Sequence, residues 1–100
     1  MKIVAVTACP TGIAHTYMAA EQLEKTGKSL GHEIKVETQG AMGIENELSA
    51  SDIKNADFVI LAVDIEVEQR DRFDGRKIIE VPVAEAIKNP KGVFAKLATQ

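Results

Sequence analysis

Two uninterrupted apolar runs place the strongest constraint on how this chain folds. They are KIVAV at positions 2–6 and DFVILAV at 57–63. A short apolar run that ends at turn-forming or polar residues is typical of a strand buried on both faces, as in a parallel sheet covered by helices. The sequence therefore predicts an α/β fold with these two runs as its central strands.

The segment between the two runs predicts one long helix and one strand. Apolar residues recur at three- or four-residue steps from Ala14 to Leu30, which indicates an amphipathic helix, and Gly31 supplies its end. HEIKVET at 32–38 alternates apolar and charged residues. This alternation predicts an edge strand whose charged side chains point outward: Glu33, Lys35 and Glu37.

The second half of the chain continues the alternation. QGAMG at 39–43 is expected to be a glycine-containing loop, and Ser49 with Asp52 has the spacing of a capping box that opens a short helix. KIIEV at 77–81 predicts a further strand. Three more helices are expected, at 66–73, from Pro82 to Ile87, and from Asn89 and Pro90 to Leu97.

Strands that alternate with helices predict a parallel sheet with helices on both faces. Because crossover connections are right-handed, two central and two edge strands favour the strand order 2-1-3-4, a Rossmann-like arrangement. The length of 100 residues suits one domain, expected to span 1–100. We therefore expect a single four-stranded α/β domain.

Composition excludes several functional classes. The net charge of −3 gives no footprint for nucleic acid, and no stretch approaches the ~20 apolar residues of a membrane span. No signal peptide is recognisable, so a cytoplasmic protein without direct membrane insertion is expected. A single cysteine excludes an internal disulfide, and neither a metal site nor a cofactor is predicted.

That cysteine, Cys9, lies where the first strand gives way to the first helix. In a sheet of this order the ligand crevice lies beyond the carboxyl ends of the first and third strands, so the loop 7–15 and Asp64 should line it. The free N–H groups at the helix start favour anions, and Gly12 lets the backbone curl closely. The sequence predicts a phosphate loop between strand and helix that holds a thiolate and a phosphoryl group together.

The stretch CPTGIAHTYMAA at 9–20 resembles the active-site signature of the fructose-family IIB proteins of the bacterial phosphoenolpyruvate-dependent sugar phosphotransferase system. The resemblance continues through VETQG at 36–40, AVDIEVE at 62–68 and RF at 72–73, so it covers essentially the whole chain. It implies a type-2 (fructose-type) EIIB domain with a four-stranded parallel sheet. It also implies a cysteine that accepts a phosphoryl group from a phosphohistidine of the IIA partner. That cysteine then donates the group to a sugar bound by the membrane IIC partner. The resemblance therefore implies a domain that associates peripherally with the IIC component.

Carried over to this chain, the resemblance makes Cys9 the phosphocysteine. The implied phosphate loop consists of Pro10, Thr11, Gly12, Ile13, Ala14, His15 and Thr16. Thr16 is either a hydroxyl donor to the sulfur or an ordinary first-turn residue, and His15 either adds charge to the phosphoryl site or lies on the surface. Secondary candidates are Asp64, which orients the loop, meets a partner or caps a helix, and Gln39 with Gly40, which shape a neighbouring loop.

Two other readings stay open at this point. Small cysteine-dependent phosphatases and arsenate reductases use Cys-x5-Arg followed by Ser or Thr, but here the sixth residue after Cys9 is His15, with Thr16 next. A non-catalytic anion-binding module is the second alternative. For the sugar, fructose follows from the family resemblance, and mannose- or mannosylglycerate-type relatives remain alternatives. Arg70 and Arg72 are expected to be solvated helix charges.

Overall fold

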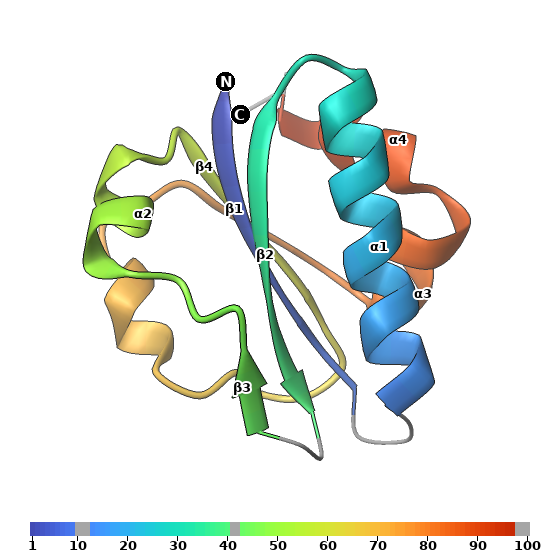
Figure 1. Ribbon diagram of the computed structural model, residues 1–100, viewed down its shortest axis with the longest axis horizontal. Coiled ribbons are helices and arrows are strands. Elements are labelled where there is room, and N and C mark those ends of the chain that lie inside the picture. Colours follow the sequence, from blue (N-terminus) through green and yellow to red (C-terminus); the bar gives the residue numbers. More distant parts are fainter. Residues whose placement is uncertain (10–12, 41–42, 98–100) are drawn as a thin grey trace.

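The computed structural model describes residues 1–9, 13–40 and 43–97. A five-stranded sheet has the order β3-β2-β1-β4-β5 and is covered by helices on both faces (Figure 1). The strands are β1 (Lys2–Ala8), β2 (Glu33–Gly40), β3 (Gly43–Glu45), β4 (Phe58–Val63) and β5 (Ile78–Val81). The helices are α1 (Ile13–Ser29), α2 (Ala50–Asn55), the 3-10 turn η1 (Arg70–Phe73), α3 (Val83–Lys88) and α4 (Pro90–Leu97).

The two apolar runs form the centre of the sheet, as predicted. β1 pairs in parallel with β2 on one side and with β4 on the other, so that Ala5 lies between Val36 and Ile60. β4 pairs in parallel with β5. The four parallel strands therefore confirm the predicted order, and because they are parallel their carboxyl ends lie at the same edge of the sheet.

The prediction of four strands was wrong by one. β3 pairs antiparallel with the end of β2, where Thr38 faces Glu45 and Gly40 faces Gly43. The segment predicted as a loop thus contributes Gln39 and Gly40 to β2 and Gly43 to β3, and positions 41 and 42 lie outside the described residues. Three residues are too few for a recognisable period-2 pattern. Gly43 also has φ +89, a backbone conformation that glycine adopts without strain.

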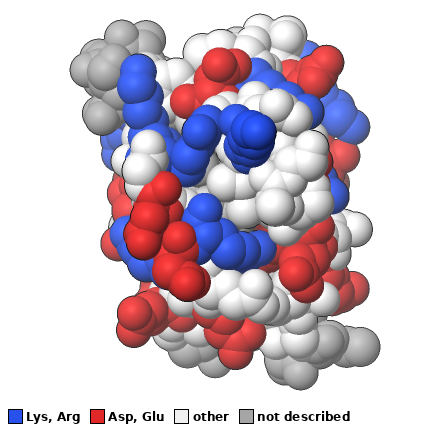
Figure 2. Space-filling view, turned by 90° about the vertical axis from the view of Figure 1, so that its left-hand side faces the viewer, with Lys and Arg blue, Asp and Glu red and all other residues white. Residues whose placement is uncertain are grey.

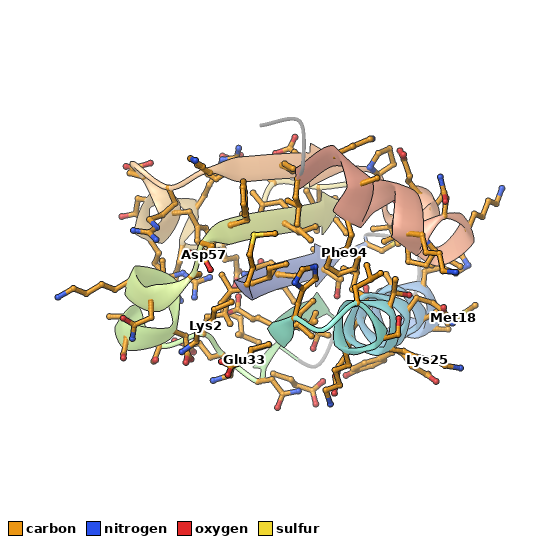
Figure 3. The ribbon with its side chains drawn as sticks, turned by 90° about the horizontal axis from the view of Figure 1, so that it is seen from above. Lys2, Met18, Lys25, Glu33, Asp57 and Phe94 are labelled. Carbon is orange, nitrogen blue, oxygen red and sulfur yellow. The ribbon has the colours of Figure 1, made fainter. Side chains whose placement is uncertain are left out.

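Helices on the two faces of the sheet bury two separate apolar clusters. α1, α3 and α4 cover one face, where Leu23 and Phe94 pack with Ala5 and Ile60. α2 and η1 lie over the other face, where Phe73 and its neighbours pack against β1 and β4 (Figure 1). Figure 3, which looks down on the molecule from above, shows Phe94 between α4 and the sheet.

Local signals explain where the shorter helices begin. Ser49 and Asp52 form the predicted capping box: the Ser49 hydroxyl accepts from the Asp52 N–H, and the Asp52 carboxylate accepts from the Ser49 N–H. η1 is shorter than the helix predicted at 66–73. It begins only after Gln69, whose φ of 58 lies in the left-handed region and breaks the helical backbone.

Candidate functional site

Cys9 directly follows β1 at the carboxyl end of the sheet, and α1 begins four residues later at Ile13. Its side chain is 9% exposed, so the sulfur lies at the boundary between core and solvent. The strand order changes direction between β1 and β4, which places Cys9 at the point where α/β sheets bind ligands. The predicted loop residues Pro10, Thr11 and Gly12 lie outside the described residues.

Two buried threonines connect the end of β1 to the first turn of α1. The Thr7 hydroxyl donates a hydrogen bond of 3.0 Å to the Thr16 carbonyl, and both side chains are almost completely buried. Thr7 was not singled out from the sequence, although a threonine after an apolar strand run is the signal that could have found it. This contact fixes the start of α1 relative to the strand that carries Cys9.

The Thr16 hydroxyl has no hydrogen-bond partner among the described residues, although its side chain is only 1% exposed. A buried hydroxyl without a partner is destabilising and calls for an explanation, such as a ligand that completes it. Ala14 and His15, in the same turn, are exposed. In the first turn of α1, the Thr16 side chain is therefore buried, whereas Ala14 and His15 are exposed to solvent.

Asp64 joins Cys9 to the start of α3. Its backbone N–H donates to the Ala8 carbonyl at 3.0 Å, which sets its position at the end of β4. One carboxylate oxygen, Oδ2, lies 3.8 Å from the Cys9 sulfur, within reach of the S–H group. The other, Oδ1, accepts a hydrogen bond of 3.2 Å from the Val83 N–H. The carboxylate therefore contacts the thiol and also caps a helix.

A pocket of about 420 Å³ lies beside the thiol, between α1 and α3. Its walls are largely apolar, and His15, Asp64 and Lys88 add charged or titratable groups. The residues that line it are Cys9, His15, Met18, Asp64, Val83, Ala84, Ile87 and Lys88. Figure 3 shows Met18 on the outer side of α1. The pocket gives an incoming group a route to Cys9 through a mostly apolar surface.

On the opposite face of the sheet, a buried ion pair fixes the end of β2. The Glu37 side chain is 0% exposed and accepts hydrogen bonds of 2.9 Å from both terminal nitrogens of Arg72 and from the Leu48 N–H. The prediction that Glu37 points outward was therefore wrong, as was the expectation that Arg72 is a solvated charge. Both errors have one cause, since η1 folds over this part of β2 and brings the two charges together.

These contacts determine the ionisation of Glu37. Burial by itself raises the pKa of the carboxyl, but the hydrogen bonds from Arg72, the Leu48 N–H and Gln39 outweigh it, so the pKa lies below its ordinary value of 4.5. The same pairing raises the pKa of Arg72. Glu37 is thus a carboxylate at neutral pH, held by a bidentate partner.

Gln39 extends this pair toward the candidate site. Its amide nitrogen donates to Glu37 at 2.8 Å, and its amide also bonds both the N–H and the carbonyl of Glu68. Because Gln39 lies beside Ala8 in the sheet, the network holds the loop after β4 close to the end of β1. Gln39 therefore shapes the neighbouring loop, while Gly40 is the last residue of β2.

The face formed by β3, α2 and η1 carries charged side chains of both signs. Figure 2 shows a cluster of Lys and Arg in the middle of this face, with Asp and Glu around it, including several toward the lower edge. On β3, Glu45 accepts a hydrogen bond from the Tyr17 hydroxyl of α1, which raises the pKa of Tyr17.

Comparison with known proteins identifies the family of this chain. Residues 4–96 match the family model described as "PTS system, Lactose/Cellobiose specific IIB subunit". The chain therefore belongs to the IIB family of the sugar phosphotransferase system (PTS), whose members are phosphotransfer modules. In the described part of the chain, no helix has the length and apolar character needed to cross a membrane.

Similar proteins carry fructose-related names. The "PTS system fructose-like EIIB component 2" of Escherichia coli K12 is 52% identical over 96 residues, which cover 96% of this chain and 91% of that protein. The "PTS system fructose-specific EIIABC component" of Bacillus subtilis is 50% identical over 99% of this chain, but the match covers only 15% of that longer protein.

Solved structures agree with the fold. The solution structure of an Enzyme IIB subunit of the PTS from Escherichia coli K12 has a TM-score of 0.91 and 43% identity, covering 97% of this chain and 90% of that one. An arsenate reductase in a phosphate-binding state has a TM-score of 0.51 and 17% identity. The second likeness concerns the fold alone.

Proposed function

We propose that this chain is a fructose-type EIIB domain spanning 1–100, in which Cys9 carries the phosphoryl group. Cys9 accepts the group from a phosphohistidine of a IIA protein or domain and donates it to a sugar, fructose, held by a membrane IIC partner. The domain itself acts at the cytoplasmic face of the membrane, beside IIC. The observation that carries the proposal is the position of Cys9, which lies between β1 and α1 at the pocket formed with α3.

The position of Cys9 just before α1 supports a cysteine nucleophile. Phosphoryl transfer depends mainly on positioning and on stabilising the equatorial oxygens. Pro10 to Gly12 precede the 17-residue helix α1 in sequence, and the first N–H groups of this helix are the natural donors to those oxygens. In place of the arginine of a hydrolytic Cys-x5-Arg loop, the chain has His15, which suits a group that is held briefly and passed on.

The partners follow from how similar proteins are built. One relative is named an EIIBC component and another an EIIABC component, so in those proteins a IIB part is fused to the parts named C, or A and C. We infer that this chain works between a IIA donor and a IIC transporter. The mostly apolar pocket of about 420 Å³ beside Cys9 is where the side chain that brings the phosphoryl group would enter.

Mass measurement tests the proposal directly. The protein is incubated with phosphoenolpyruvate, the upstream phosphocarrier proteins and a IIA component, and its mass is then measured before and after fructose and IIC membranes are added. We expect one phosphoryl group on Cys9 that is lost only when sugar and IIC are both present. Release of inorganic phosphate without sugar would favour a phosphatase, and no mass change would favour an anion-binding module.

Replacing Thr16 with valine should slow phosphorylation of Cys9 by about tenfold, the effect of one lost hydrogen bond to the reacting group. The free energy of unfolding should stay the same or rise slightly, because the buried hydroxyl has no partner among the described residues. Thr38→Val is the matched control, since the Thr38 hydroxyl is also buried and also has no hydrogen-bond partner among the described residues. Rates from quenched-flow phosphorylation that fall equally in both variants would contradict a specific role for Thr16.

A further inference from the structure

We propose that the Asp64 carboxylate makes the phosphorylated form of Cys9 a ready donor, because its contact with Cys9 turns from attractive to repulsive when the sulfur is phosphorylated. This inference rests on the proposed function. In the unphosphorylated protein the Cys9 S–H group donates to Asp64 Oδ2, 3.8 Å away. A phosphorylated sulfur has no proton to donate, and its phosphoryl oxygens are negative, as the carboxylate is.

Two hydrogen bonds orient Asp64, which is an exposed residue. Its backbone N–H bonds the Ala8 carbonyl, and its Oδ1 accepts from the Val83 N–H at the start of α3. Asp64 is also the acidic residue among the described residues that line the pocket, which include the cationic Lys88 and the titratable His15. The structure therefore keeps one negative charge at the atom that becomes phosphorylated.

Bonds and protons are conserved in both transfer steps, and the contact between Cys9 and Asp64 changes in each. In the first step the Cys9 sulfur forms a bond to phosphorus, the donor's nitrogen–phosphorus bond breaks, and the thiol proton ends on the imidazole nitrogen. In the second step the sugar hydroxyl oxygen attacks phosphorus, the sulfur–phosphorus bond breaks, and the hydroxyl proton ends on the sulfur. The second step restores the S–H contact with Asp64 and removes the repulsion, so the carboxylate favours donation over retention.

The test is the equilibrium between phosphorylated IIA and this protein, measured by mass for the parent and for Asp64→Asn. Asparagine keeps an oxygen for the Val83 N–H and removes the charge, while an NH2 group replaces the oxygen that faces the sulfur. For Asp64→Asn we expect the equilibrium to shift about tenfold toward phosphorylated Cys9. This is the size of effect expected when one unit charge is removed at this distance in a partly solvated site. Transfer onward to sugar should slow. Glu66→Gln is the control, because it removes one exposed negative charge from the same loop.

Asp64→Ala separates charge from position. If charge is responsible, Asp64→Asn and Asp64→Ala shift the equilibrium in the same direction, and Glu66→Gln stays within about twofold of the parent. If Asp64 only positions the loop, Asp64→Asn behaves as the parent and only Asp64→Ala differs, which would overturn this inference. A shift toward unphosphorylated Cys9 would also overturn it. A parent protein that accepts no phosphoryl group would instead contradict the proposed function, and this inference with it.

Discussion

Replacing Arg72 with alanine is expected to lower the free energy of unfolding by about 3–5 kcal/mol, the range for a buried charge that loses its partner. Glu37 is fully buried, and the Arg72 side chain, itself 16% exposed, supplies two of its hydrogen bonds. Among the described residues, the carboxylate without Arg72 keeps the Leu48 N–H and Gln39 as donors. Denaturant unfolding at neutral pH, followed by circular dichroism, measures the difference.

A second ion pair from the same 3-10 turn serves as the control. Arg70 pairs with Glu80, but the two side chains are 42% and 52% exposed, so Arg70→Ala should cost less than about 1 kcal/mol. Equal losses in the two variants would contradict the role given to the buried pair.

The effect of Arg72 should also depend on pH. Because the pKa of Glu37 is lowered in the folded protein, its contribution to stability is present above pH 4.5 and is lost as the pH falls through the folded pKa. The difference between Arg72→Ala and the parent should therefore shrink in acid. A difference that stays constant down to the acid limit of folding would mean that another contact of Arg72 is responsible.

The parts of the fold that could be predicted from sequence are those set by local patterns. Two continuous apolar runs predicted β1 and β4, and the Ser49–Asp52 spacing predicted the capping box of α2. With the helices between them, these patterns were sufficient for the parallel order β2-β1-β4-β5. Each signal lies within a few neighbouring residues, so no knowledge of distant contacts was needed.

The features that were missed depend on residues far apart in the chain. Glu37 was placed on an exposed face because alternation in β2 assigns it there, but Arg72, 35 residues later, folds onto it. Three consecutive polar residues, Glu37 to Gln39, are all buried, and this break in the alternation was the available signal. Likewise, the contact between Cys9 and Asp64 joins residues 55 positions apart. Sequence placed both at the same edge of the sheet, but not within reach of each other.

Cys9→Ser should reduce phosphoryl acceptance by at least about a thousandfold while leaving the fold intact. A hydroxyl is a far weaker nucleophile than a thiolate near neutral pH, and removing the nucleophile of a covalent mechanism commonly costs this much or more. The side chain is small and 9% exposed, and serine keeps a donor for Asp64 Oδ2. Stability should therefore change by less than about 1 kcal/mol. Single-turnover phosphorylation and thermal unfolding measure the two effects separately.

His15 decides how this result is interpreted, since it lines the same pocket and its imidazole can also accept a phosphoryl group. His15→Ala should still form a phosphocysteine, whereas Cys9→Ser should form no phosphorylated species. Phosphohistidine is acid-labile, so comparing acid and neutral quenching identifies the acceptor atom. If Cys9→Ser still gains a phosphoryl group, and that group is lost in acid and absent in the Cys9→Ser/His15→Ala double variant, the nucleophile is His15. The role of Cys9 would then be limited to packing.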